Sequence, residues 1–171
     1  MGIGRGKKTR LFFVGIIVAV ASTQLTYGQE RGPVTNLPMP RYVSLKAGKA
    51  NARRGPSLSH RIDWVFVRKH MPLEIYGEYE NWRRVRDLDG AGGWVHYSLL
   101  SGSRTAILTI DMQPMLQAPS SDATIVARFE KGAIGDIRHC VPNWCQLTSG
   151  GYKGWVSKAA IWGVYADEKK D

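Results

Sequence analysis

The stretch Asn81–Val85 (NWRRV), followed by Gly93–Val95 (GWV), decides the fold because it occurs twice in the chain. The second copy is Asn143–Leu147 (NWCQL) followed by Gly154–Val156 (GWV). The two Asn-Trp pairs are 62 residues apart, and the two Gly-Trp-Val triplets are 61 residues apart. Two motifs repeated at a nearly constant offset indicate an internal duplication.

Each repeat has the pattern of a small all-β unit. Short apolar runs alternate with Gly, Pro, Asn and Asp, and no stretch keeps helical spacing for more than about two turns. A unit of this size buries only about 60 % of its unfolded surface, and curling into a barrel hides its sheet edges. The sequence therefore predicts two small barrels, at residues 42–101 and 106–164, connected through Ser101–Thr109. The strands predicted in the first barrel are Val43–Leu45, Trp64–Val67, Leu73–Tyr76, Trp82–Val85 and Trp94–Val95.

Residues 1–28 have the layout of a secretory signal peptide. Four basic residues and no acidic one precede an uninterrupted apolar run, Leu11–Ala21. Eleven residues are too few to cross a hydrocarbon core, which needs about 20. Cleavage after Ala21 or Gly28 fits the pattern, and the later position leaves the apolar run its full length. A short buried strand and an uncleaved anchor are the alternatives. We expect residues 29–41 to be an extended linker and residues 165–171 a charged C-terminal tail.

The basic charge of the chain is partly a property of this leader. The sequence has 24 Lys plus Arg and 14 Asp plus Glu, a net charge of +10. Without the four leader charges 20 basic and 14 acidic residues remain, a net charge of +6. Export predicts a periplasmic or secreted protein with no membrane span in its mature form. Nucleic acid is not expected as a partner there, and anionic groups of the cell envelope suit a mildly basic surface better.

The repeated residues resemble those of the bacterial Src-homology-3-like (SH3b) domains, in particular tandem-domain exported proteins of Gram-negative bacteria. The resemblance implies small β-barrels that serve as adaptors: related domains accompany cell-wall hydrolases, bind peptidoglycan or have no assigned role. The stretches that carry the resemblance are Leu45–Arg54 with Gly55–Ser57, Asn81–Val85, Gly92–Val95, Cys140–Cys145, Gly154–Val156 and Ile161–Val164.

Alternation of side chains along a strand predicts tryptophans on the outside of both barrels. If Val85 and Val95 point inward, Trp82 and Trp94 point outward, and the second repeat follows the same parity. The indoles either stack as cross-strand pairs that stiffen the sheet or line a shallow aromatic groove. On the second reading the candidate ligand-binding residues are Trp82, Arg84, Trp94, Trp144 and Trp155.

Arginines gather beside the tryptophans of the first repeat only. Arg83, Arg84 and Arg86 flank Trp82, and Arg53 and Arg54 precede a turn. Guanidinium groups near an aromatic face suit the capture of carboxylate or phosphate. A solvated basic edge that discourages strand aggregation is the other reading. The second repeat has Cys145, Gln146 and Thr148 instead, so an anion site would belong to the first barrel alone.

The two cysteines, Cys140 and Cys145, enclose Val-Pro-Asn-Trp. Pro-Asn is typical of a turn, and two cysteines at the facing ends of a hairpin in an oxidising compartment predict a disulfide in the second barrel. His139 beside Cys140 suggests a Cys-His nucleophile or a metal ligand, but neither a third catalytic group nor four metal ligands accompany it. We therefore expect no catalytic residue, no metal and no cofactor.

Four carboxylates of the first repeat, Asp63, Glu74, Glu78 and Glu80, come near to a cluster. Paired-carboxylate glycosidase chemistry needs a deep cleft, which two small barrels hardly provide. Glu78 and Glu80 share a strand face beside a turn, which favours a solvated edge.

These observations predict an exported, non-enzymatic binding protein of the cell envelope. The expected partner is the stem peptide of peptidoglycan or an envelope protein. The alternative is a structural or regulatory partner that modulates a cell-wall hydrolase without binding wall polymer.

Overall fold

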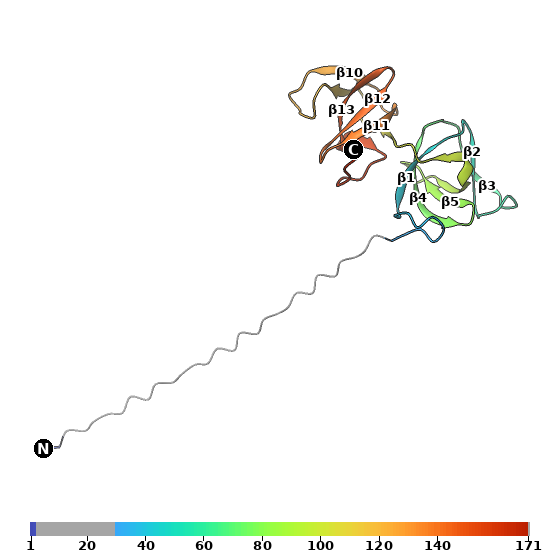
Figure 1. The fold of residues 1–171 in the computed structure, drawn as a ribbon, viewed down its shortest axis with the longest axis horizontal. Coiled ribbons are helices and arrows are strands. Elements are labelled where there is room, and N and C mark those ends of the chain that lie inside the picture. The colour runs from blue at the N-terminus through green and yellow to red at the C-terminus, as the bar shows by residue number, and fades with distance from the viewer. Residues whose placement is uncertain (3–29, 171) are drawn as a thin grey trace.

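The structure of the protein is a computed structural model that describes residues 1–2 and 30–170. The signal peptide predicted at residues 1–28 therefore lies almost wholly outside the described residues. Within them no helix is long and apolar enough to span a membrane. Two rounded β domains lie side by side, joined by a short connection (Figure 1).

The first domain is one antiparallel sheet of seven strands in the order β3-β2-β6-β5-β4-β1-β7. The five strands predicted from the sequence are all present. The two that were missed are β2, whose short stretch ANAR has little apolar signal, and the two-residue β7. A 3-10 turn, η1 (Tyr97–Leu99), leads into the last strand. The strands are β1 (Arg41–Leu45), β2 (Ala50–Arg53), β3 (Ile62–Phe66), β4 (Pro72–Tyr79), β5 (Trp82–Arg86), β6 (Gly92–His96) and β7 (Leu100–Ser101).

The second domain repeats this topology strand for strand, with the order β10-β9-β13-β12-β11-β8-β14. The all-β class and the duplication are thus confirmed. Its strands are β8 (Thr105–Leu108), β9 (Gln113–Leu116), β10 (Ile125–Phe129), β11 (Ile134–Cys140), β12 (Trp144–Ser149), β13 (Tyr152–Ser157) and β14 (Ile161–Trp162), with η2 (Lys158–Ala160) before the last strand. Most of the linker predicted at Ser101–Thr109 is strand, and only residues 102–104 connect the domains.

Each domain has its own apolar core, as two separate barrels require. The inward residues of β5 and β6, Val85 and Val95, are fully buried in the first core, and Leu147 and Val156 take their places in the second. Alternation along these strands places every second residue on the outer face of the sheet. The outer face of β5 and β6 is therefore where a binding site can form.

A disulfide joins Cys140 and Cys145, as the sequence predicted. The two residues are register partners across the hairpin of β11 and β12, with their Cα atoms 4.1 Å apart. The backbone N–H of Cys140 also donates to the carbonyl of Lys170 at 2.8 Å. The chain after β14 thus returns to the disulfide hairpin.

Residues 30–40 form a closed loop, and not the extended linker predicted for residues 29–41. Arg31 and Pro38 pair in an isolated antiparallel bridge. The turn between them uses Asn36 at a φ of 56°, a left-handed conformation that asparagine tolerates better than most residues. The prolines that suggested an extended chain instead lie on either side of this turn.

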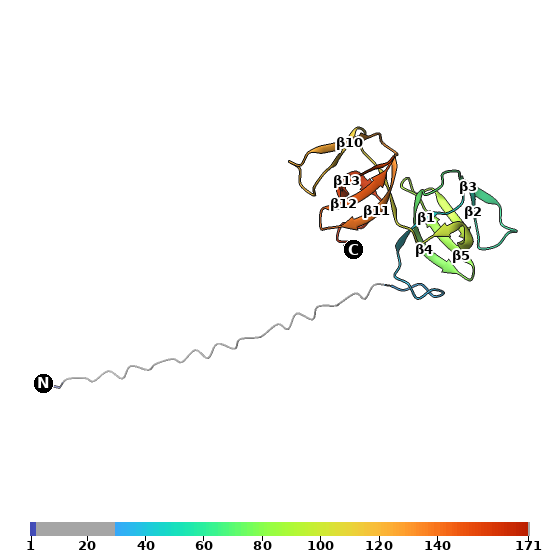
Figure 2. The same ribbon diagram turned by 45° about the horizontal axis from the view of Figure 1, so that its top comes forward.

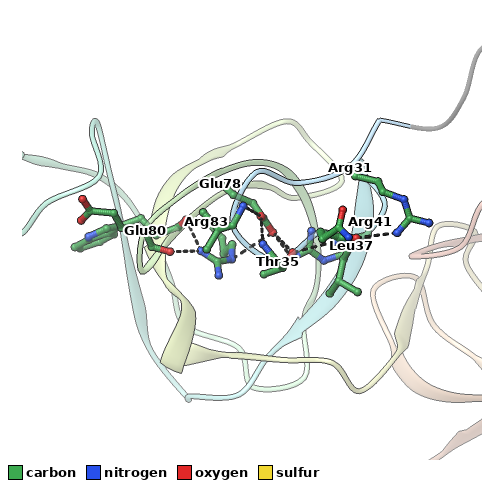
Figure 3. Close-up of polar contacts among 10 residues, drawn as sticks. Arg31, Thr35, Leu37, Arg41, Glu78, Glu80 and Arg83 are labelled. Atoms are coloured by element: carbon green, nitrogen blue, oxygen red, sulfur yellow. Dashed lines mark hydrogen bonds and ion pairs between the residues drawn. The ribbon is translucent and has the colours of Figure 1, made fainter.

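A buried carboxylate anchors this loop to the first domain (Figure 3). Glu78 accepts hydrogen bonds from the backbone N–H groups of Val34 and Thr35 at 3.1 and 2.9 Å and from the Thr35 hydroxyl at 2.7 Å. Arg41 Nη2 lies 2.6 Å away, and Arg83 Nε lies 3.6 Å away. Burial by itself would raise the pKa of Glu78, but these hydrogen bonds outweigh it and lower the pKa to about 2. The expected solvated edge is therefore wrong for Glu78.

An aromatic cluster holds the two domains together. Tyr42 of β1 meets Trp162 edge-on with ring centroids 5.0 Å apart and Tyr165 at 4.7 Å. Arg104, in the connection, lies with its guanidinium carbon 5.5 Å from the Tyr42 ring centroid. Burial, reinforced by the nearby charge of Glu74, raises the pKa of Tyr42 to about 12. These residues form the interdomain seam.

Hydrogen bonds across the seam fix the relative position of the domains. The Tyr165 hydroxyl donates to Glu74 Oε1 at 3.0 Å, and Arg86 donates to the other oxygen of Glu74 at 2.6 Å. The Thr105 hydroxyl of the second domain donates to the carbonyl of His70 in the first at 2.8 Å. Part of the predicted charged tail is therefore structural, because Tyr165 belongs to this seam.

Candidate binding face of the first domain

The outer surface of β4, β5 and β6 carries alternating aromatic and arginine side chains. Arg84 and Trp94 are register partners on β5 and β6. The guanidinium carbon of Arg84 lies 5.1 Å from the Tyr76 ring centroid, and that of Arg86 lies 5.4 Å from the same ring. We call Tyr76, Arg84, Arg86 and Trp94 the aromatic–arginine face.

Glycine at position 77 keeps this face closely packed. A Cβ atom there would lie 3.2 Å from Arg84 Cβ and 3.8 Å from the outer edge of the Trp94 ring, at Cη2. Trp94 on β6 therefore extends past Arg84 toward β4. The three strands present one continuous layer, in which the Arg84 guanidinium lies over the Tyr76 ring and stays exposed.

The two arginines of this face differ in their polar contacts. Arg86 Nη2 lies 2.6 Å from the buried carboxylate of Glu74, and hydrogen bonding to Glu74 raises the pKa of Arg86. The Arg84 side chain has no hydrogen bond or ion pair to another described residue. Its guanidinium donors are therefore available to an incoming anion, whereas those of Arg86 are partly engaged.

A pocket of about 400 Å³ lies near this face, where β5 and β6 meet β2. Its base includes Trp82, whose ring meets His96 edge-on with centroids 5.5 Å apart. Arg53, the register partner of Trp94, lines the pocket and donates to the carbonyls of Leu58 and His60. We call this the Trp82 pocket; its lining is Lys49, Ala50, Asn51, Arg53, Leu58, Trp82, His96 and Leu99.

The family described as bacterial SH3 domain matches the chain at residues 46–102 and again at residues 110–163. This chain belongs to the bacterial SH3 domain family. Each match covers six of the seven strands of one sheet, so the resemblance seen in the repeated motifs is confirmed. No curated protein matches the chain.

Two solved structures are similar to the tandem SH3 domains. One is NlpC2 from Trichomonas vaginalis, 16 % identical, with a TM-score of 0.34 over 72 % of this chain. The other is NlpC1 from the same organism, 15 % identical, with a TM-score of 0.34 over 77 % of this chain. The match covers 48 % of each of those chains, so this protein spans about half of their length.

The tryptophans predicted to share an outer face differ in how far they are exposed. In the first SH3 domain Trp82 lies on the opposite side of β5 from Val85, as the parity predicted, but it is only 8 % exposed. Strand β2 and the loop that follows it approach this end of β5 and β6, which a count along one strand does not reveal. Trp82 therefore offers a ligand only the part of its ring that lines the Trp82 pocket, while Trp94 is half-buried on the open face.

The second SH3 domain lacks the arginines of the first. Trp155 is the register partner of Gln146 and meets the His139 ring edge-on at 5.7 Å. Trp144 lies opposite Ser157, and both tryptophans are half-buried. The asymmetry expected from the sequence is thus present, and the charged aromatic surface belongs to the first domain.

Two residues of the candidate site were missed in the sequence. Tyr76 meets Arg84 only because a register shift between Ile75 and Gly77 changes the pairing of β4 with β5. His96 belongs to no motif in the sequence, and β6 places it opposite Trp82. Arg83, by contrast, was noted as one of the flanking arginines but is buried and faces Glu78.

Proposed function

We propose that this protein is a non-enzymatic binding module of the cell envelope that recognises the stem peptides of peptidoglycan. The observation that carries the proposal is the exposed Arg84 guanidinium, which lies over the Tyr76 ring on the strand next to Trp94. A guanidinium fork binds carboxylates in a bidentate manner, and peptide carboxylates are the anionic groups of such a ligand. The flanking rings and the Trp82 pocket supply apolar surface for the rest of the peptide.

Other features of the chain support the same function. The bacterial SH3 family implies an adaptor role, and the disulfide and the predicted signal peptide favour an extracytoplasmic location, periplasmic or secreted. We propose that no cofactor takes part and that catalysis belongs to a partner protein. In the part of the chain that the structure describes, no three His, Cys, Asp or Glu side chains gather to hold a metal ion.

Retention on purified sacculi tests the proposal. We expect the protein without its leader to be retained at about 0.01 M salt, where electrostatic attraction reaches farthest, and less at 0.15 M. The variant R84Q should bind about tenfold more weakly, because it removes a charge-assisted contact. R61Q is the matched control, since Arg61 is also exposed but pairs with Asp63 on the β3 hairpin.

The same assay discriminates the other functions. Failure of the unmodified protein to bind at low salt, or equal retention of R84Q and R61Q, would reject recognition of the stem peptide by this face. Release of soluble muropeptides would show that the protein is an enzyme. We expect none.

One observation favours an envelope protein as the partner instead. Strand β3 ends the sheet of the first domain, on the side away from the second domain in both views (Figures 1 and 2). Its Trp64 is 47 % exposed, and Val67 just beyond it is 72 % exposed. An apolar strand edge suits strand addition by an extended segment of another protein. A W64A variant that keeps sacculus binding but loses a protein partner would support this alternative.

A further inference from the structure

A basic groove runs along the interdomain seam, apart from the candidate binding face. Two pockets of about 480 and 460 Å³ adjoin there, and both are lined by His70 of the first domain and Asp136 of the second. Clefts between domains are common positions for ligand sites. We call this the seam groove; its charged or ionisable lining residues are Arg68, Lys69, His70, Arg104, Asp136, Arg138 and Lys170.

Positive charge dominates the seam groove. Arg68, Lys69 and His70 are consecutive and exposed in the connection between β3 and β4. Arg68 extends toward the second domain, where its Nη1 lies 3.8 Å from the position of a Cβ atom at Gly132. Of the described residues that line the groove, Asp136 is the single carboxylate.

The carboxylate does not neutralise this surface. Arg138 Nη2 lies 3.8 Å from Asp136 Oδ2, and both side chains are about half exposed, so this ion pair is weak. Arg138 Nε also donates to the Thr148 hydroxyl at 3.2 Å, and Lys170 Nζ donates to the Arg138 carbonyl at 3.4 Å. Cations of both domains and a hydroxyl therefore converge on one groove.

The backbone holds the basic loop rigidly in this place. His70 has a φ of 65°, a left-handed conformation uncommon outside glycine. Its N–H donates to the carbonyl of Leu45 at 2.8 Å, and its own carbonyl accepts the Thr105 hydroxyl of the second domain. Because His70 is fixed to both domains, Arg68 and Lys69 are placed at the groove before any ligand arrives, which lowers the cost of binding.

We propose that the seam groove binds a phosphate monoester or diester whose alcohol part carries a hydroxyl or ammonium group. The phosphate oxygens accept from Arg68, Lys69 and Arg138, since a tetrahedral anion can use donors that arrive from several directions. Asp136 accepts a hydrogen bond from the hydroxyl or ammonium group of the ligand. Either a soluble phosphate ester or a phospholipid headgroup presents this chemistry.

Titration with sn-glycerol 3-phosphate, followed by backbone amide NMR shifts at low salt, tests the proposal. We expect saturable shifts in residues 68–70 and 136–138. The variant R68Q/K69Q should bind at least about tenfold more weakly, because two charged contacts are lost. The control R61Q/R128Q removes two exposed cations outside the seam groove and should change the affinity by less than about twofold. Far-UV circular dichroism verifies that both variants are folded.

A second arm identifies the source of the phosphate. Co-sedimentation with phosphatidylglycerol vesicles, absent with phosphatidylcholine vesicles and lost in R68Q/K69Q, would identify a lipid headgroup. Glycerol 3-phosphate binding without vesicle binding would identify a soluble ester. The proposal is overturned if neither probe binds, if the shifts lie outside the seam groove, or if the control variant weakens binding as much as R68Q/K69Q does.

Discussion

At the scale of single residues, Glu78 stabilises the first domain only while it is ionised. Its pKa is about 2 in the folded protein against an ordinary value of 4.5. A lowered pKa means that the stabilisation is fully present above about pH 4.5 and is lost as the pH falls toward 2. We expect E78Q to lower the free energy of unfolding of the first domain by about 3 kcal/mol at pH 7, with the difference from the unmodified protein vanishing near pH 2. Urea denaturation at a series of pH values measures this.

The neighbouring E80Q is the control, because the Glu80 side chain is exposed and accepts no hydrogen bond from another described residue. If E78Q and E80Q depended on pH in the same way, the buried network in Figure 3 would not be the source of the stabilisation.

The side of the strand on which a residue lies could be predicted from the sequence, but its burial could not. Alternation placed Trp82 on the correct side of β5, because the parity of a strand depends on local geometry alone. Its burial depends on β2 and the following loop, and the burial of Glu78 depends on a loop some 40 residues earlier in the chain. Such contacts leave no trace in the spacing of residues along one strand. The side chains on this face could therefore be predicted from the sequence, but how far each one is buried could not.

At the scale of elements, the turn and the disulfide of the β11–β12 hairpin were predictable, since the turn residues and both cysteines lie within one short stretch. Closing a loop of this length stabilises a domain by about 2 kcal/mol. We expect C140A/C145A to lower the free energy of unfolding of the protein by about that amount. Urea denaturation of the two proteins measures the loss. Titration of two free thiols in the denatured, unreduced protein would contradict the bridge.

The loop of residues 30–40 is the opposite case among the elements. Its prolines gave an extended pattern, although the loop closes through its own backbone bridge between Arg31 and Pro38. Its attachment to the first domain depends on Arg41 and Glu78, which lie outside it. Contacts with such distant residues leave no local pattern in the sequence.

At the scale of the whole molecule, the duplication was predictable but the arrangement of the two domains was not. The seam is formed by Tyr42, Trp162 and Tyr165. None of these residues belongs to the motifs that the two repeats share. Tyr165 follows the last strand, so replacing it leaves both cores intact. Y165A removes the ring contact with Tyr42 and the hydrogen bond to Glu74, and we expect a loss of about 1–3 kcal/mol of coupling between the domains.

That loss should be visible as a change in cooperativity. We expect the unmodified protein to unfold in one calorimetric transition and Y165A to unfold in two, because each domain then melts on its own. Y79A is the matched control: Tyr79 is 52 % exposed on the first domain and takes no part in the seam. One transition in Y165A would mean that Tyr165 is not needed for the coupling. Two transitions in the unmodified protein would mean that the seam does not couple the domains. The seam groove would then lack the fixed walls that its proposed ligand requires.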